Sequence, residues 1–123
     1  MPYEPKSLGK LVFEGNTKMI EKCLTWDVLP GVDMKAYVAW SRKTAETLAK
    51  QPGMIEFRAS RNLLGNPQVR VSVTWKSLAD WAKFAESDLW HSMEAECRTF
   101  ATNIRMELWG PSPVMAEPLR PAK

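Results

Sequence analysis

The sequence has few of the residues that metal and nucleotide sites require. It contains one histidine, His91, and two cysteines, Cys23 and Cys97, without Cys-x-x-Cys spacing. Zinc sites take three or four closely placed His, Cys or carboxylate ligands, so we expect no metal. No glycine-rich loop follows a candidate strand, so nucleotide binding is not indicated. We expect both cysteines to be small buried hydrophobic residues in a reducing compartment.

Long apolar runs and charge of one sign are also missing. No apolar stretch approaches the roughly 20 residues of a membrane span. The first residues lack the basic-then-apolar order of a signal peptide, so we expect a cytoplasmic protein without membrane contact. The 17 basic residues are interspersed with 14 acidic ones, giving a net charge of +3. This pattern is typical of a solvated mixed surface and does not indicate nucleic-acid binding.

The 123 residues suffice for one domain with a single core. Residues 68–75 and 104–109 alternate apolar and polar side chains, the period of a half-buried strand. Between them, apolar residues repeat at helical spacing. Ser77 is a candidate N-cap for this helix, and Ser87 is a second one. The second half of the chain therefore predicts a strand, a helix that breaks and restarts at Ser87, and a strand.

The first half predicts a strand over residues 18–26, a helix from an Asp33 N-cap to about Lys50, and a strand over residues 54–61. In the strand over residues 54–61, one side is expected to carry Ile55, Phe57 and Ala59. The inner stripe of the helix is expected to consist of Tyr37, Val38, Ser41, Ala45 and Leu48.

The resulting order is β-α-β-β-α-β, an α+β fold of the ferredoxin-like type in which both helices cover one face of an antiparallel sheet. We assign residues 1–17 to an N-terminal arm, 18–110 to the domain and 111–123 to a proline-rich C-terminal tail. The uncovered sheet face is predicted to be polar. It can face water, or face another sheet through paired charges.

The candidate catalytic residues are Lys22, His91 and Glu94. Lys22 lies on the otherwise apolar face of the first strand, where it either snorkels to solvent or lines a cavity. If it is buried, desolvation lowers its pKa and makes it a usable base or cationic anchor. His91 has a suitable unperturbed pKa for a base, and Glu94 follows three residues later on a similar helix face. Both can equally be exposed surface residues.

Large aromatic residues are the candidate substrate-binding groups, because they line pockets for flat ligands as well as filling cores. The residues in question are Phe57, Trp75, Trp81, Phe84 and Trp90.

Three stretches, Val73–Phe84, Ser87–Trp90 and Glu107–Ser112, resemble the antibiotic biosynthesis monooxygenase (ABM) domains of the dimeric α+β barrel superfamily. The resemblance covers roughly residues 18–112. It implies a homodimer whose two sheets stack into a barrel, with a pocket between each sheet and its helices. Some relatives oxidise aromatic polyketides or quinols with O2 and no cofactor. They need only a dry pocket, a base and a group that stabilises the developing charge.

A haem-degrading branch of the family uses an Asn, a Trp and a His. Aligning on its motifs puts Lys22, Phe84 and Glu94 at these positions, and none of the three matches. We therefore do not expect haem degradation.

Two classes of function remain. One is a cofactor-independent monooxygenase acting on a small hydrophobic aromatic substrate, polyketide-like or quinol-like. The other is a non-catalytic dimeric barrel that binds a small apolar molecule or a partner. An enclosed pocket faced by a lysine or histidine with a shifted pKa favours the first, and an interior filled by tryptophans favours the second.

Overall fold

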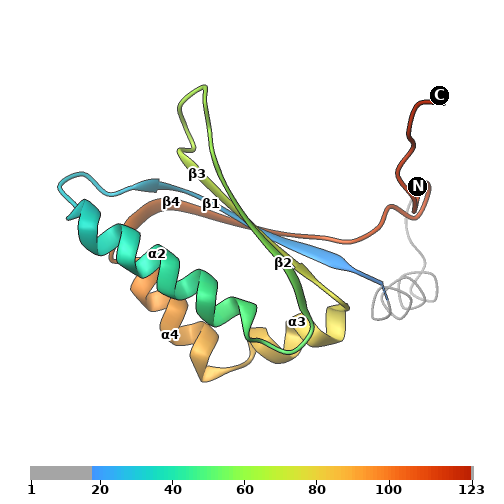
Figure 1. The fold of residues 1–123 in the computed structure, drawn as a ribbon, viewed down its shortest axis with the longest axis horizontal. Helices are drawn as coiled ribbons and strands as arrows, with labels where there is room; N and C mark the ends of the chain where they lie inside the picture. The colour runs from blue at the N-terminus through green and yellow to red at the C-terminus, as the bar shows by residue number, and fades with distance from the viewer. Residues whose placement is uncertain (1–17, 123) are drawn as a thin grey trace.

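The computed structural model describes residues 18–122; the predicted N-terminal arm, residues 1–17, lies outside them. The elements are β1 (Ile20–Val28), α2 (Met34–Ala49), β2 (Met54–Arg61), β3 (Val69–Trp75), α3 (Leu78–Ala85), α4 (Asp88–Cys97) and β4 (Ala101–Trp109). The strands form one antiparallel sheet in the order β2-β3-β1-β4. All three helices lie on the same side of this sheet (Figure 1). The ferredoxin-like α+β prediction is confirmed.

Strand β1 lies at the centre of the sheet, between β3 and β4. Its residue Lys22 pairs with Val73 of β3 and with Leu108 of β4. Side chains alternate along a strand, so Lys22 shares the helix-covered face with the buried residues Leu24 and Trp26. Lys22 therefore lies on the inner face of the sheet, the apolar face on which the alternation of the first strand placed it.

The helix caps form as the sequence predicts. The Asp33 carboxylate accepts a hydrogen bond from the Lys35 amide, and Ser77 accepts one from the Asp80 amide. Ser87 separates α3 from α4: its hydroxyl donates to the Phe84 carbonyl at 2.6 Å and accepts from the Trp90 amide at 3.2 Å. One serine thus stabilises the end of one helix and the beginning of the next, which confirms the predicted break.

Two local predictions are wrong. Ile55 is 51% exposed because β2 has a register shift between Met54 and Glu56, so it does not share the inner side with Phe57. In α2, Val38 is 41% exposed, whereas Trp40 is buried. The spacing of three between Tyr37 and Trp40 puts Trp40 on the helix face that meets the sheet, about 200° around the axis from Val38.

The sheet face without helices is polar, as predicted. Some of its polar groups pair within the chain: the Ser72 hydroxyl donates to Glu21, and Arg58 forms an ion pair with Glu56 at 3.2 Å. Beyond β4, residues 111–122 form neither helix nor strand. No helix in the described part of the chain is both long and apolar enough to cross a membrane.

The double role of Ser87 gives a stability prediction. Ser87→Ala removes both hydrogen bonds and is expected to lower the free energy of unfolding by about 1 kcal/mol. Ser92→Ala, at an exposed position in the middle of α4, is the control and is expected to change it by less than about 0.5 kcal/mol. Urea unfolding of the two variants measures the difference. Equal values would contradict the capping role.

Candidate active site

A cavity of about 330 Å³ lies between the inner face of the sheet and the three helices. All four strands and all three helices contribute to its wall, which is almost wholly apolar. Five of the six tryptophans, all except Trp109, line this cavity and do not fill it. This volume is at the lower end of the range for small-molecule sites.

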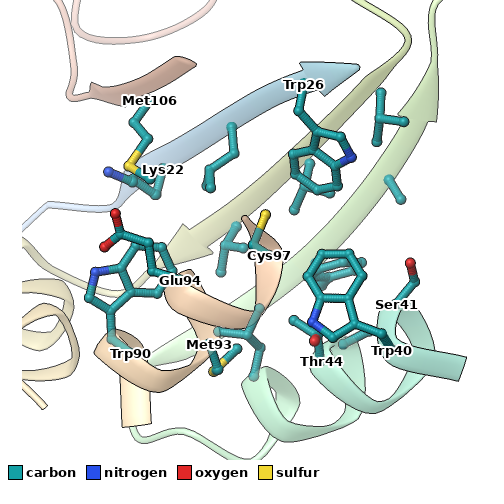
Figure 2. A pocket seen from close by; sticks show the side chains of 18 of the residues that line it. Lys22, Trp26, Trp40, Ser41, Thr44, Trp90, Met93, Glu94, Cys97 and Met106 are labelled. Atoms are coloured by element: carbon teal, nitrogen blue, oxygen red, sulfur yellow. The ribbon is translucent and has the colours of Figure 1, made fainter. Parts of the chain in front are cut away.

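Lys22 and Glu94 are the ionisable groups at one end of the cavity. Their side chains point toward each other beside Trp90 (Figure 2), and Lys22 Nζ lies 5.5 Å from the centre of the Trp81 ring. Burial lowers the pKa of Lys22 from its usual 10.5, while the negative charge of Glu94 partly opposes this effect. Glu94 in turn accepts a hydrogen bond from Arg98 at 2.8 Å, across one turn of α4. Lys22 is thus less strongly protonated than a solvated lysine.

Aromatic rings form the wall around this end. Trp75 is 1% exposed and stacks on Phe84 with ring centres 5.1 Å apart, and Phe84 packs against Trp90 at 5.8 Å. Phe84 belongs to α3 and Trp90 to α4. The break at Ser87 therefore lets two short helices present their rings to the same end of the cavity.

A second aromatic cluster lies at the opposite end of the cavity. We call this end of the cavity the α2 end. Trp40 packs edge-on to Trp26 at 6.1 Å and stacks on Phe100 at 5.2 Å, and the Trp26 indole donates to the Tyr37 hydroxyl at 3.2 Å. Our sequence-based list of site residues missed this cluster. The signal was present, since Leu24 and Trp26 share one face of the first strand and Tyr37 and Trp40 are three residues apart.

Cys97 lines the cavity, but burial raises the pKa of its thiol to about 11. It therefore stays protonated at neutral pH and is a poor nucleophile. Cys23 is also buried, so both cysteines are buried as predicted, and both are free. Within residues 18–122, no group of three or more His, Cys, Asp or Glu side chains could hold a metal ion.

The family model described as "Antibiotic biosynthesis monooxygenase" matches residues 23–96. The chain belongs to this family. Among curated proteins, a search found no significant match.

Solved structures share the fold of this ABM domain. SnoaB from Streptomyces nogalater, described as a cofactor-independent oxygenase, is 14% identical, with a TM-score of 0.63 over 81% of this chain and 99% of that chain. Hydroxynitrile lyase from Passiflora edulis is 14% identical, with a TM-score of 0.67 over 76% and 93%. A putative antibiotic biosynthesis monooxygenase from Nitrosomonas europaea is 13% identical, with a TM-score of 0.64 over 80% and 95%.

The ABM domain brings together all but one of the predicted site residues. The cavity is lined by Lys22, Phe57, Trp75, Trp81, Phe84, Trp90 and Glu94. His91 is exposed and does not line the cavity. On α4, Trp90 and Glu94 are four residues apart and share a face, whereas His91 is rotated about 100° from Trp90. The expectation that His91 and Glu94 work from one face is therefore corrected, and Lys22 and Glu94 remain the candidate catalytic pair.

The burial of Lys22 predicts an effect on stability that depends on pH. Because its pKa is lower in the folded protein, folding is penalised by the desolvated charge at neutral pH, and the penalty is lost as the pH rises toward 10.5. We therefore expect Lys22→Met to raise the urea midpoint at pH 7 and to raise it less at pH 9.5. Lys43→Met, at an exposed position of α2, is the control. If both variants shift the midpoint equally at both pH values, Lys22 is solvated.

Proposed function

We propose that this ABM domain is a cofactor-independent monooxygenase for small, electron-rich aromatic substrates that carry a phenol or enol. The observation that carries the proposal is the half-buried Lys22, with a lowered pKa, facing an apolar aromatic cavity. The fold shared with SnoaB, described as a cofactor-independent oxygenase, supports the same reading.

Lys22 acts as the base in its neutral amine form. In the enol form of the substrate, one proton of a ring CH2 group has moved to the ketone oxygen, which becomes a hydroxyl. Lys22 takes the proton from this hydroxyl. The electron pair of the broken O–H bond then delocalises onto the former CH2 carbon. This carbon reduces O2 and forms a C–O bond, which gives a peroxide. The Lys22 ammonium returns its proton to the peroxide. The hydroperoxide then loses water as the remaining C–H bond breaks, so that CH2 and O2 become C=O and H2O.

Glu94 acts through Lys22 as a positioning residue. Its carboxylate favours the ammonium that forms when Lys22 accepts the proton, and Arg98 fixes the carboxylate through their ion pair at 2.8 Å. The surrounding rings displace part of the water around the half-buried Lys22, which strengthens the attraction between the ammonium and the substrate anion. The stacked pair Trp75 and Phe84 supplies a flat wall for an aromatic substrate.

We infer that the protein forms a homodimer through the polar sheet face. The internal pairing of Ser72 with Glu21 and of Arg58 with Glu56 supports this, because a face whose polar groups are already paired is less costly to cover. A solved neighbour from Bacteroides fragilis, 9% identical with a TM-score of 0.55 over 74% of this chain and 94% of that chain, is described as dimeric. Native mass spectrometry of the full chain is expected to give the mass of two copies. A single-copy mass would overturn the dimer.

Oxygen uptake with 1,8-dihydroxyanthrone tests the reaction. This substrate carries phenol groups and a CH2 between its rings, and the purified protein without added metal or flavin is expected to consume one O2 per anthraquinone formed. Loss of a general base typically costs 10²- to 10⁴-fold, so Lys22→Met is expected to reduce kcat by about 100-fold or more. Lys83→Met, exposed on α3, is the control. Uptake no faster than the protein-free rate would favour the non-catalytic barrel that binds a small apolar molecule.

The pH dependence assigns the base. The rate is expected to rise with pH through the lowered pKa of Lys22, since the amine must be neutral to take the proton. Glu94→Gln removes a charge that raises this pKa, so the inflection should move to lower pH. Glu96→Gln, at an exposed position of the same helix, should leave the inflection in place. An inflection that Glu94→Gln does not move would exclude Lys22 as the titrating base.

A further inference from the structure

The α2 end of the cavity carries polar groups that the proposed reaction does not use. Trp40 and Thr44 lie one turn apart on α2, and both line the cavity. Figure 2 shows them at the end opposite Lys22 and Glu94, with the Trp40 nitrogen on the side of its ring next to Thr44. This end of the cavity therefore offers polar groups of its own to a bound molecule.

The Trp40 indole N–H is buried and has no hydrogen-bond partner within residues 18–122. The whole residue is only 7% exposed. Buried donors are normally paired, so an unpaired donor beside a cavity needs an explanation, and a partner that a bound molecule brings or reorients is one.

The Thr44 hydroxyl is also uncommitted among the described residues. Threonine in a helix often donates to the carbonyl four residues earlier, and Thr47 does so, to Lys43 at 2.8 Å. Thr44, three residues before Thr47, makes no such bond to Trp40. A threonine hydroxyl accepts and donates at the same time. It can therefore accept the Trp40 N–H and offer its own hydrogen to the cavity.

We propose that Trp40 and Thr44 form a subsite for a carbonyl oxygen of the substrate. In the complex, the Trp40 N–H donates to Thr44 Oγ1, and the Thr44 hydroxyl donates to the carbonyl. This inference rests on the proposed function for its orientation, with the reacting hydroxyl at Lys22. Among the proposed substrates, fused-ring phenols with a carbonyl on the ring farthest from that hydroxyl are then expected to bind most tightly.

The spacing of the two ends supports more than one ring. Lys22 and Trp26 are four residues apart on β1, which places their backbones ~13 Å apart. Trp40 packs on Trp26, with ring centres 6.1 Å apart. A single ring held at Lys22 does not extend to this end, whereas two or more fused rings with a carbonyl substituent do.

A matched pair of ligands tests the subsite. 6-Acetyl-2-naphthol carries the carbonyl, and 6-isopropyl-2-naphthol has a similar shape without an acceptor. Titrated anaerobically, the wild type is expected to bind the acetyl compound about fivefold more tightly, the value of one net hydrogen bond. Thr44→Val should abolish this preference, while Thr47→Val, whose lost hydroxyl is already bonded to the backbone, should retain it.

A measurement on the unmodified protein guards against a misfolded variant. Among the indole N–H signals of the six tryptophans, the ¹⁵N-detected signal of Trp40 is expected to move downfield with the acetyl compound and not with the isopropyl compound. Equal affinities, binding of neither compound, a preference that survives Thr44→Val, or an unmoved Trp40 signal would each overturn the subsite. These tests need no turnover. Absent oxygen uptake together with an intact carbonyl preference would therefore overturn the oxygenase and leave the subsite standing.

Discussion

A lysine on the inner face of the central strand is the constraint on which the site depends. Lys22 pairs with Val73 and Leu108, so its ammonium enters the layer between sheet and helices. Desolvation disfavours the charged form, and the Trp81 face and the Glu94 carboxylate offset only part of that cost. A lysine held in this way loses its proton at a lower pH than a solvated lysine does. That property makes the apolar cavity a candidate active site.

The two ends of the cavity differ because different helices line them. The Ser87 cap divides the second helical segment, so the cavity wall receives Trp81 and Phe84 from α3 and Trp90 from α4. Helix α2 closes the other end with the cluster around Trp40. Along β1, the same alternation that points Lys22 inward also points Trp26 inward. One strand therefore runs from the Lys22 end of the cavity to the α2 end.

Patterns that depend on one element were predictable from the sequence. Strand alternation placed Lys22 among apolar neighbours, and short polar side chains before helical segments identified the Asp33, Ser77 and Ser87 caps. Features set by contacts between elements were not. The register shift that exposes Ile55 depends on how β2 pairs with β3, and the burial of Trp40 depends on the rotation of α2 against the sheet. The sequence also placed His91 and Glu94 on one face of their helix. Residues three positions apart point in similar but not equal directions, so the spacing alone did not show that Glu94 lines the cavity and His91 does not.

The most direct test of this account is the pKa of Lys22 itself. Proteins labelled with ¹³C at lysine Cε allow each lysine to be titrated by NMR, and the signal missing from Lys22→Met assigns the residue. We expect the pKa of Lys22 to lie below 10.5, the usual value for a lysine. A value at or above 10.5 would mean that Lys22 is solvated or fully neutralised by Glu94. It would contradict the assignment of Lys22 as the base.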